Sequence, residues 1–442
     1  MTRRGMSWLG AGLLVGASAG LLEISSLLNP AMAAADDTAL LMGYAASPDP
    51  LPSYIDGVMK LFISPDPPLF DGQPTYPGYL PEVQPVELGA NYQLVLTQGV
   101  AQLDQGIRDH LLDADDHVVV FGYSESTSIA TQEMINLNAL PVGERPGDDQ
   151  LSFVLFENLN NPNGGFLERL PFLAGIPFPA TPADTPYDTA VYSIEYSGSS
   201  DFPQYPLNFL ATANAMAGFV NLHPAFLPGW PTTFDFGSVK DAVELPTSIE
   251  DGNIDYFLIP TQNLPILDGL RGIPFIGKPM ADLMQPAMRV LIDLGYDRTG
   301  PADVLTPADW TSMPNIDWAE VSAQMQLGWE QGLIAAQVDL GLLPSSDLPD
   351  MYPYLPDLSG LIAGSTAPDA AAALTAAGTV ADAAGANTDL SAIFGDLSSW
   401  ATTELSSLFG ANAATDITSL LGGDLLTNLS TLLTNPLDFL GL

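Results

Sequence analysis

Residues 118–127 read VVVFGYSEST, and this stretch decides the fold that we expect. Apolar residues from Val118 run into Gly122, Tyr123 and Ser124, and the chain then turns polar. The following residues, STSIATQEMINLNAL, begin with serine and threonine and contain no helix breaker before Pro141. The pattern predicts a buried strand, a sharp turn at Ser124 and a helix.

Three further apolar runs, at 39–42, 152–156 and 190–196, are bounded by turn residues and predict strands. Apolar residues from Tyr92 to Leu111 fall at near-helical spacing, and so do those in PMADLMQPAMRVLIDLGYDR, residues 279–298. Alternating strands and helices predict an α/β fold with a mostly parallel sheet. Because the strands are apolar at consecutive positions, we expect helices on both faces of the sheet.

Residues 202–279 are rich in Pro, Phe and Leu and show little periodicity. They either line a pocket or form a cap over it, or they are ordinary loops that pack on the core.

The two ends of the chain differ from its centre. Residues 1–33 combine Arg3 and Arg4, a short apolar run and a small-residue exit, which predicts a secretory signal peptide or, if it is not cleaved, a signal anchor. We therefore expect a secreted or cell-envelope protein with a catalytic domain over 36–300. Residues 301–442 form an acidic, low-complexity C-terminal region, either short helices that dock on a partner or envelope surface, or a weakly structured tail.

Charge and cysteine content exclude several functions. The chain has 52 acidic and 11 basic residues, a net charge of −41, and no Lys or Arg after Arg298. Such a surface repels nucleic acids and anionic lipid headgroups, so neutral or amphipathic substrates are the expected partners. There is no cysteine. This excludes a thiol nucleophile, a cysteine metal site and a redox role, and no cofactor is expected.

Ser124 is the candidate nucleophile. A serine on a strand-to-helix turn needs small residues two positions before and after it, because strand and helix approach each other closely there. Gly122 fills the first position, and Ser126 replaces the glycine that usually fills the second. A serine hydroxyl also needs a base, usually histidine.

The chain has three histidines, and His223 is the candidate base. His110 and His117 precede the strand that leads to Ser124, so they would lie at its opposite end. A metal site built from these two histidines and the aspartates of the loop between them is less favoured than a solvated acidic loop. We expect no metal.

Asp201 is the candidate acid that orients His223, because it follows the strand at 190–196. The order Ser124, Asp201, His223 is that of α/β-hydrolases. Two backbone N–H donors would stabilise the oxyanion: that of Glu125, directly after the nucleophile, and one from the loop at 43–46, for which Tyr44 and Ala45 are the candidates.

Several segments together resemble a known family. LLMGYAASPDP at 40–50, VVVFGYSESTSIATQEM at 118–134, YSGSSDFPQYPLN at 196–208 and PMADLMQPAMRVLIDLGYDR at 279–298 resemble, in order, the segments of the mycobacterial PE-PPE domain. The resemblance covers about residues 40–298. It implies a cutinase-like α/β-hydrolase acting on acyl esters, with Ser124 as nucleophile, Asp201 as acid and His223 as base. Some relatives are similar to acyltransferases that move fatty acyl groups between trehalose glycolipids of the cell envelope.

Three functions remain open at this stage. The first is an exported serine esterase or lipase with an acyl-enzyme on Ser124. The second is an acyltransferase that shares this intermediate, and the third is a catalytically silent protein that binds the envelope or membrane surface. The expected substrate is an acyl ester or glycolipid, and the sequence predicts no oligomeric state.

Overall fold

The computed structural model describes residues 37–89, 91–171, 179–227, 232–249, 252–312 and 314–348. The predicted signal segment at 1–33, and the C-terminal region from residue 349 on, lie outside the described residues. The described chain forms two compact units, one of residues 37–261 with 295–312 and the other of 262–294 with 314–348. Among the described helices, none is long and apolar enough to cross a membrane.

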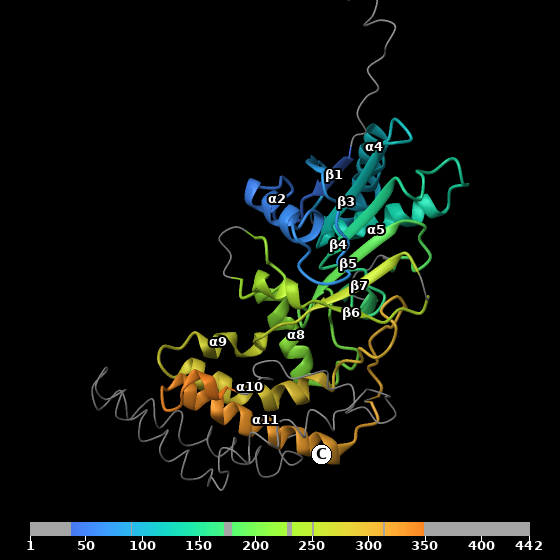
Figure 1. The fold of residues 1–442 in the computed structure, drawn as a ribbon. Helices are drawn as coiled ribbons and strands as arrows, with labels where there is room; N and C mark the ends of the chain where they lie inside the picture. The colour runs from blue at the N-terminus through green and yellow to red at the C-terminus, as the bar shows by residue number, and fades with distance from the viewer. Residues whose placement is uncertain are drawn as a thin grey trace, which may run out of the picture. The chain divides into compact units, whose positions relative to one another are not determined.

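The first unit is built on a seven-stranded sheet in the order β2-β1-β3-β4-β5-β7-β6 (Figure 1). All neighbouring strands are parallel except β6, which runs antiparallel to β7 at the edge. The predicted α/β fold with a mostly parallel sheet is thus confirmed. Strands β2, β6 and β7 were not predicted. The strands are β1 (Asp37–Met42), β2 (Leu80–Gln84), β3 (His117–Tyr123), β4 (Leu151–Phe156), β5 (Asp188–Ile194), β6 (Val243–Leu245) and β7 (Ile254–Ile259).

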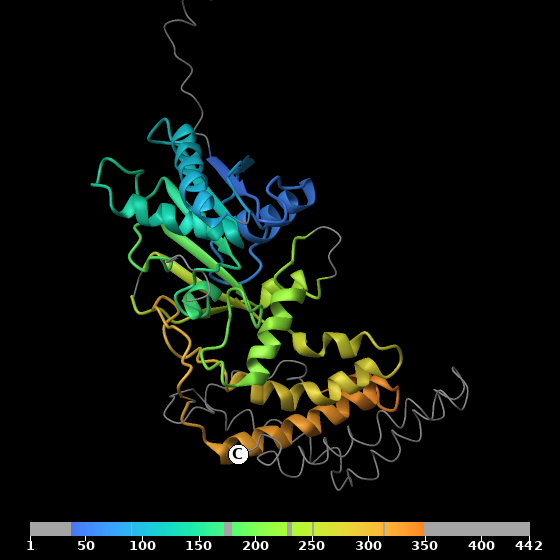
Figure 2. The ribbon, with the colours of Figure 1, turned by 180° about the vertical axis from the view of Figure 1, so that it is seen from behind.

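Helices cover both faces of this sheet, as the apolar strands predicted (Figures 1 and 2). Since side chains alternate along a strand, Val119 and Phe121 of β3 pack with α2 and η1 on one face, while Val118 and Val120 pack with α4 and α5 on the other. These elements are α2 (Pro52–Val58), η1 (Met59–Ile63), α4 (Val100–His110) and α5 (Glu125–Asn138). The helix expected from Tyr92 to Leu111 is observed as three consecutive segments. They are α3 (Tyr92–Leu94), one π-helical turn, η2 (Val95–Gly99), and α4.

The segment at 202–279 is more regular than its composition predicted. It contains α8 (Phe209–Asn221), whose start is capped by the Asn208 side chain accepting a hydrogen bond from Ala211 N–H. Alanine has the highest helix propensity, and the run ATANAMA contains no helix breaker, so a helix forms without an amphipathic pattern of charges. The other short helices of this unit are α6 (Phe166–Arg169) and η3 (Phe236–Asp241).

The second unit is helical. In it α10 (Gly277–Asp293), the helix expected within 279–298, pairs with α11 (Trp318–Asp339), which begins at an Asp317 cap. A Cβ atom on Gly332 would lie 2.0 Å from Leu283 O, so glycine is needed for this close approach. The remaining elements are η4 (Pro265–Leu267), α9 (Asp268–Arg271) and η5 (Ser345–Asp347). The region that was expected to begin at residue 301 is therefore divided, since 301–312 pack in the first unit and α11 in the second.

Candidate active site

Ser124 occupies the predicted turn between β3 and α5. Its backbone has φ 59° and ψ −124°, a conformation that a side-chain-bearing residue rarely adopts and that exposes Oγ above the strand. A Cβ atom on Gly122 would come within 3.2 Å of Ser126 O, which explains the glycine two positions before Ser124. Ser126 is fully buried, and its Oγ accepts from Tyr123 N–H and donates to Tyr123 O. Ser126, the second small residue of the turn, therefore also connects the two ends of the turn by hydrogen bonds.

The neighbouring strand places a carboxylate beside this serine. β3 and β4 are parallel with Tyr123 opposite Phe156, so the next residues, Ser124 and Glu157, leave the sheet side by side. Ser124 N–H donates to Phe156 O at 3.2 Å. Glu157, like Ser124, has a positive φ of 55°, so both strands end in a strained residue at the carboxyl edge of the sheet.

His223 connects the serine to the carboxylate. Its Nε2 lies 2.8 Å from Ser124 Oγ, and its Nδ1 lies 3.0 Å from Glu157 Oε2. The imidazole is 12% exposed and Glu157 is fully buried. Rings of Phe219 and Tyr123 flank the imidazole, with centroids at 5.1 and 5.6 Å.

The backbone of His223 is also held. Tyr123 Oη donates a hydrogen bond to His223 O, and His223 N–H donates to Gly218 O at 3.1 Å. Burial keeps the pKa of Tyr123 well above its usual value, so the phenol retains its proton for this bond. The histidine is thus fixed both by its ring and by its main chain.

Four donors surround the Glu157 carboxylate. Oε1 accepts from Ile194 N–H at 2.7 Å and from Ser200 Oγ at 2.6 Å. Oε2 accepts from Ser199 Oγ at 2.6 Å and faces His223 Nδ1. These donors satisfy both oxygens of the buried carboxylate and give it one orientation. It therefore favours the imidazole tautomer with the proton on Nδ1, which leaves Nε2 free to accept the serine proton.

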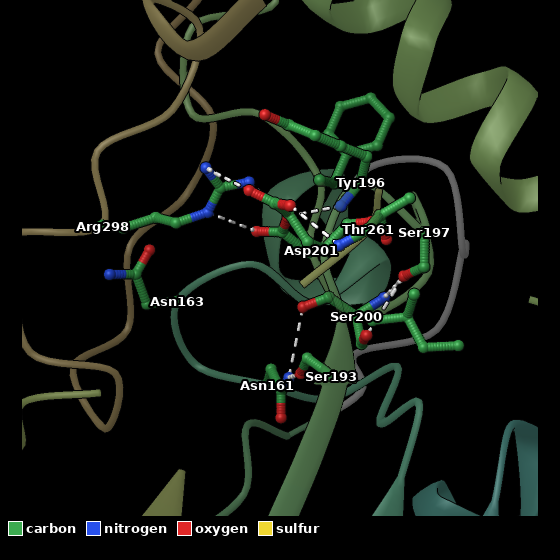
Figure 3. Close-up of polar contacts among 12 residues, drawn as sticks. Asn161, Asn163, Ser193, Tyr196, Ser197, Ser200, Asp201, Thr261 and Arg298 are labelled. Atoms are coloured by element: carbon green, nitrogen blue, oxygen red, sulfur yellow. Dashed lines mark hydrogen bonds and ion pairs between the residues drawn. The ribbon is translucent and has the colours of Figure 1, made fainter. Parts of the chain in front are cut away.

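Asp201, the acid expected from the sequence, lies in a different cluster. Its Oδ2 accepts from Tyr196 N–H at 2.8 Å and from Arg298 Nη2 at 2.5 Å (Figure 3). The Arg298 guanidinium also stacks on the ring of Tyr296, 4.2 Å from its centroid. Figure 3 shows the Asp201 carboxylate turned toward Arg298, with Ser200 on another side of the same turn. The carboxylate that contacts His223 is therefore that of Glu157 and not that of Asp201. Asp201 instead closes the turn that carries Ser199 and Ser200.

That turn packs closely on α8. Gly198 has φ 75°, and a Cβ atom there would lie 2.2 Å from Ala215 O. A Cβ atom on Gly218 would lie 1.8 Å from Tyr196 O. Two glycines thus let the turn after β5 touch the helix that leads to His223.

The expected oxyanion donors have different surroundings. Glu125 N–H opens α5, where the first N–H groups of a helix have no intrahelical acceptor and point outward beside Ser124. The Glu125 carboxylate accepts from Gly89 N–H at 2.8 Å, and burial raises its pKa. Tyr44 N–H instead donates to Ser47 O at 3.2 Å within a tight turn, so it is engaged inside its own loop.

The Tyr44 side chain still links this loop to the site. Its hydroxyl donates to Phe226 O at 2.9 Å, and its ring packs on Tyr123 with centroids 4.8 Å apart. Ala45 is exposed at the tip of the turn, and its N–H stays a predicted donor.

The other two histidines lie away from the serine, as expected from their places in the chain. His110 pairs with Glu82 at 3.4 Å, and His117, at the start of β3, pairs with Asp37 at 3.0 Å. Within the described part of the chain, no group of three His, Asp or Glu side chains that could hold a metal ion occurs.

Taken together, the geometry can perform nucleophilic chemistry on a carbonyl. It provides a hydroxyl in contact with an imidazole, an imidazole in contact with a buried carboxylate, and a helix N-terminus at the hydroxyl. These are the parts from which serine-dependent acyl transfer is built.

The chain is similar to known proteins of one family. A model of the PE-PPE domain matches residues 75–297, about half of the chain. The chain is 46% identical to PE family protein PE3 of Mycobacterium tuberculosis over 59% of this chain and 55% of that protein. It is 38% identical to Esterase PE16 of the same organism over 66% of this chain and 54% of PE16.

A third relative is named for acyl transfer. SL1278 acyltransferase Chp1 of M. tuberculosis is 30% identical over 67% of this chain and 73% of Chp1. The chain spans about half the length of PE3 and PE16. No solved structure matches it. Of these three relatives, one is thus named as an esterase and one as an acyltransferase.

Proposed function

Because the chain belongs to the PE-PPE domain family, we propose that it is a serine esterase that hydrolyses acyl esters through an acyl-enzyme on Ser124. The observation that carries this proposal is the continuous contact from Ser124 Oγ through His223 to the buried Glu157 carboxylate. The relative named as an esterase supports the same reaction.

The proposed reaction has two halves. In the first, Ser124 Oγ attacks the ester carbonyl and its proton passes to His223 Nε2, while Glu157 stabilises the imidazolium. Glu125 N–H donates to the oxyanion, and the alcohol leaves with the proton from Nε2. In the second, water attacks the acyl-enzyme, gives a proton to Nε2, and the carboxylic acid leaves as Ser124 regains its proton.

The proposal includes export. Residues 1–33 have the features of a signal peptide or signal anchor, so we propose a location outside the cytoplasm, secreted or in the cell envelope. Fusion of residues 1–40 to a reporter that is active only after export tests this, and a reporter that stays inactive would contradict it.

Acyl transfer is the second candidate, and the 30% identity to an acyltransferase favours it. The acyl-enzyme is the same, but a sugar hydroxyl of a glycolipid replaces water as the second nucleophile. The two functions differ in whether water is excluded from the acyl-enzyme.

Hydrolysis of p-nitrophenyl esters by the purified protein and its variants tests the proposal. Ser124→Ala is expected to abolish turnover. Ser128→Ala is the matched control, because Ser128 lies four residues further along, in the first turn of α5, where it is buried and donates to Asn160 at 2.6 Å. Turnover that survives Ser124→Ala would contradict the proposal. Slow hydrolysis that becomes fast acyl transfer when a trehalose lipid is added would favour the transferase.

A further inference from the structure

One face of α8 is apolar and exposed. Phe209, Met216 and Val220 are 78%, 49% and 51% exposed. Ala213 is exposed as well, and it completes a series with spacings of four, three and four residues. That spacing places all four on one side of a helix, while Ala211, Asn214, Ala215 and Gly218 are buried on the other. Scattered apolar residues are common on surfaces, but a continuous stripe along one helix usually marks an interaction site.

Charge is absent from this part of the chain. No Asp, Glu, Lys or Arg occurs from Phe202 to Phe234, although the whole chain carries a net charge of −41. This run offers no side-chain charge that would attract a charged partner, so an uncharged partner fits it best. A nucleic acid or an anionic surface would need lysine or arginine, and an acidic face would repel it.

The exposed stripe leads to the candidate active site. α8 ends at Asn221, two residues before His223, and Phe219 of the same helix packs on the His223 ring with centroids 5.1 Å apart. Figure 1 shows α8 beyond one end of the central strands, apart from α4 and α5, which lie along them. With 13 residues, the helix extends about 20 Å from the site.

We propose that this stripe, Phe209, Ala213, Met216 and Val220, docks the protein on an uncharged lipid surface, so that His223 and Ser124 face esters presented by that surface. The proposal rests on the proposed function, because it concerns where the ester comes from. Exposed apolar side chains gain free energy when they leave water for a lipid interface, and they need no cations beside them when the headgroups are neutral. The uncharged run of sequence around His223 would let this part of the chain approach the same interface without desolvating a charge of its own.

The first test measures binding without catalysis. The full-length Ser124→Ala protein is mixed with phosphatidylcholine vesicles, and the bound fraction is measured by sedimentation. Binding to phosphatidylcholine is expected, with Met216→Asp/Val220→Asp weakening it at least tenfold, since each aspartate places a charge in the interface. The matched control is Leu112→Asp/Val142→Asp, which charges two residues that are 78% and 88% exposed outside α8. It is expected to leave binding unchanged.

The second test separates this proposal from the proposed function. Met216→Asp/Val220→Asp is expected to hydrolyse dissolved p-nitrophenyl acetate like the wild type but to lose most hydrolysis of an emulsified long-chain ester. If the wild type binds vesicles and hydrolyses neither ester, the proposed function fails and the docking surface stands. Equal vesicle binding by wild type and variant would overturn the docking surface.

Two other results would also overturn the docking proposal, because each would assign the stripe to a different occupant. A dimer in sedimentation velocity that Met216→Asp/Val220→Asp dissociates, without vesicle binding, would assign the stripe to a second copy of the chain. Vesicle binding that appears only after deletion of residues 349–442 would assign it to the chain's own C-terminal segment.

Discussion

Replacement of Glu157 by glutamine is the most informative single change to the site. Glutamine keeps the volume of the side chain in a fully buried position but removes the charge and half of the acceptors. Its oxygen can accept from Ile194 N–H and Ser200 Oγ, as Oε1 does now. Its NH₂ group then faces His223 Nδ1, which has to accept instead of donate.

The consequence is a change of tautomer. With the proton moved to Nε2, His223 can no longer take the proton of Ser124 Oγ, 2.8 Å away. In a serine protease the equivalent change lowers kcat by about 10⁴-fold. Here Ser200 Oγ still donates to the remaining oxygen, whereas Ser199 Oγ faces the new NH₂ group and loses its acceptor. We expect a loss of about 10³- to 10⁴-fold in kcat with little change in KM, because the carboxylate does not bind substrate.

The assay is steady-state hydrolysis of p-nitrophenyl butyrate, with circular dichroism to show that the variant is folded. Asp201→Asn is the comparison. It neutralises Asp201, which is the acid that the sequence suggested, and it leaves the contacts of His223 intact. A loss below about tenfold in Glu157→Gln would refute the assignment, and a loss of 10³-fold or more in Asp201→Asn alone would transfer the role to Asp201.

Three further predictions concern the residues around the site and the stability of the folded protein. Ser199→Ala and Ser200→Ala each remove a donor to Glu157 and should lower kcat about tenfold at unchanged KM, with threonine restoring much of it; equal activity of alanine and wild type would contradict this. Asp201→Asn weakens the pair with Arg298 and should lower the free energy of unfolding by about 1–3 kcal/mol in urea titrations while kcat falls less than tenfold. Burial, and next the charge of Asp104, raise the pKa of Glu133 from 4.5 to about 8, so the folded state holds this proton more tightly than the unfolded state. Stability should therefore fall by at most about 1.4 kcal/mol per unit between pH 5 and 8. Thermal melts of Glu133→Gln should show a smaller decline over this range, and an unchanged decline would count against the role of Glu133.

Much of the fold and half of the site could be read from local sequence. The turn at Ser124 could be predicted from neighbouring residues, because a strand, a glycine, the serine and a small residue must follow one another there. His223 followed by elimination, since His110 precedes β3 and His117 begins it, at the end opposite Ser124. The strands β1, β3, β4 and β5 were visible because their apolar runs are buried on both faces.

The carboxylate that contacts His223 was not predicted, because its position depends on strand pairing. Glu157 meets His223 only because β4 is the neighbour of β3 and Phe156 is in register with Tyr123. The signal was present, since Glu157 directly follows a predicted strand and carboxyl ends of parallel strands share one edge of the sheet. Asp201 also follows a strand, but the turn after β5 directs its serines to Glu157 and its aspartate to Arg298, 97 residues later.

In the loop at Tyr44, one of the two expected backbone donors is engaged within the loop itself. Small residues suggested a backbone donor, but the residues close a tight turn in which Tyr44 and Ser47 exchange backbone hydrogen bonds at 3.2 and 2.8 Å. α8 was missed because residues 202–279 carry no alternation of charge, and its helix depends on propensity and on the Asn208 cap.

Covalent labelling by a fluorophosphonate tests the central claim, that Ser124 is a nucleophile activated by His223, most directly. The purified protein is incubated with the probe, digested, and the modified peptide is identified by mass spectrometry. We expect a single modified residue, Ser124, no labelling in Ser124→Ala, and labelling slowed by about 10³-fold or more in His223→Ala. Labelling of another residue, or labelling of Ser124 at the same rate without His223, would contradict the account.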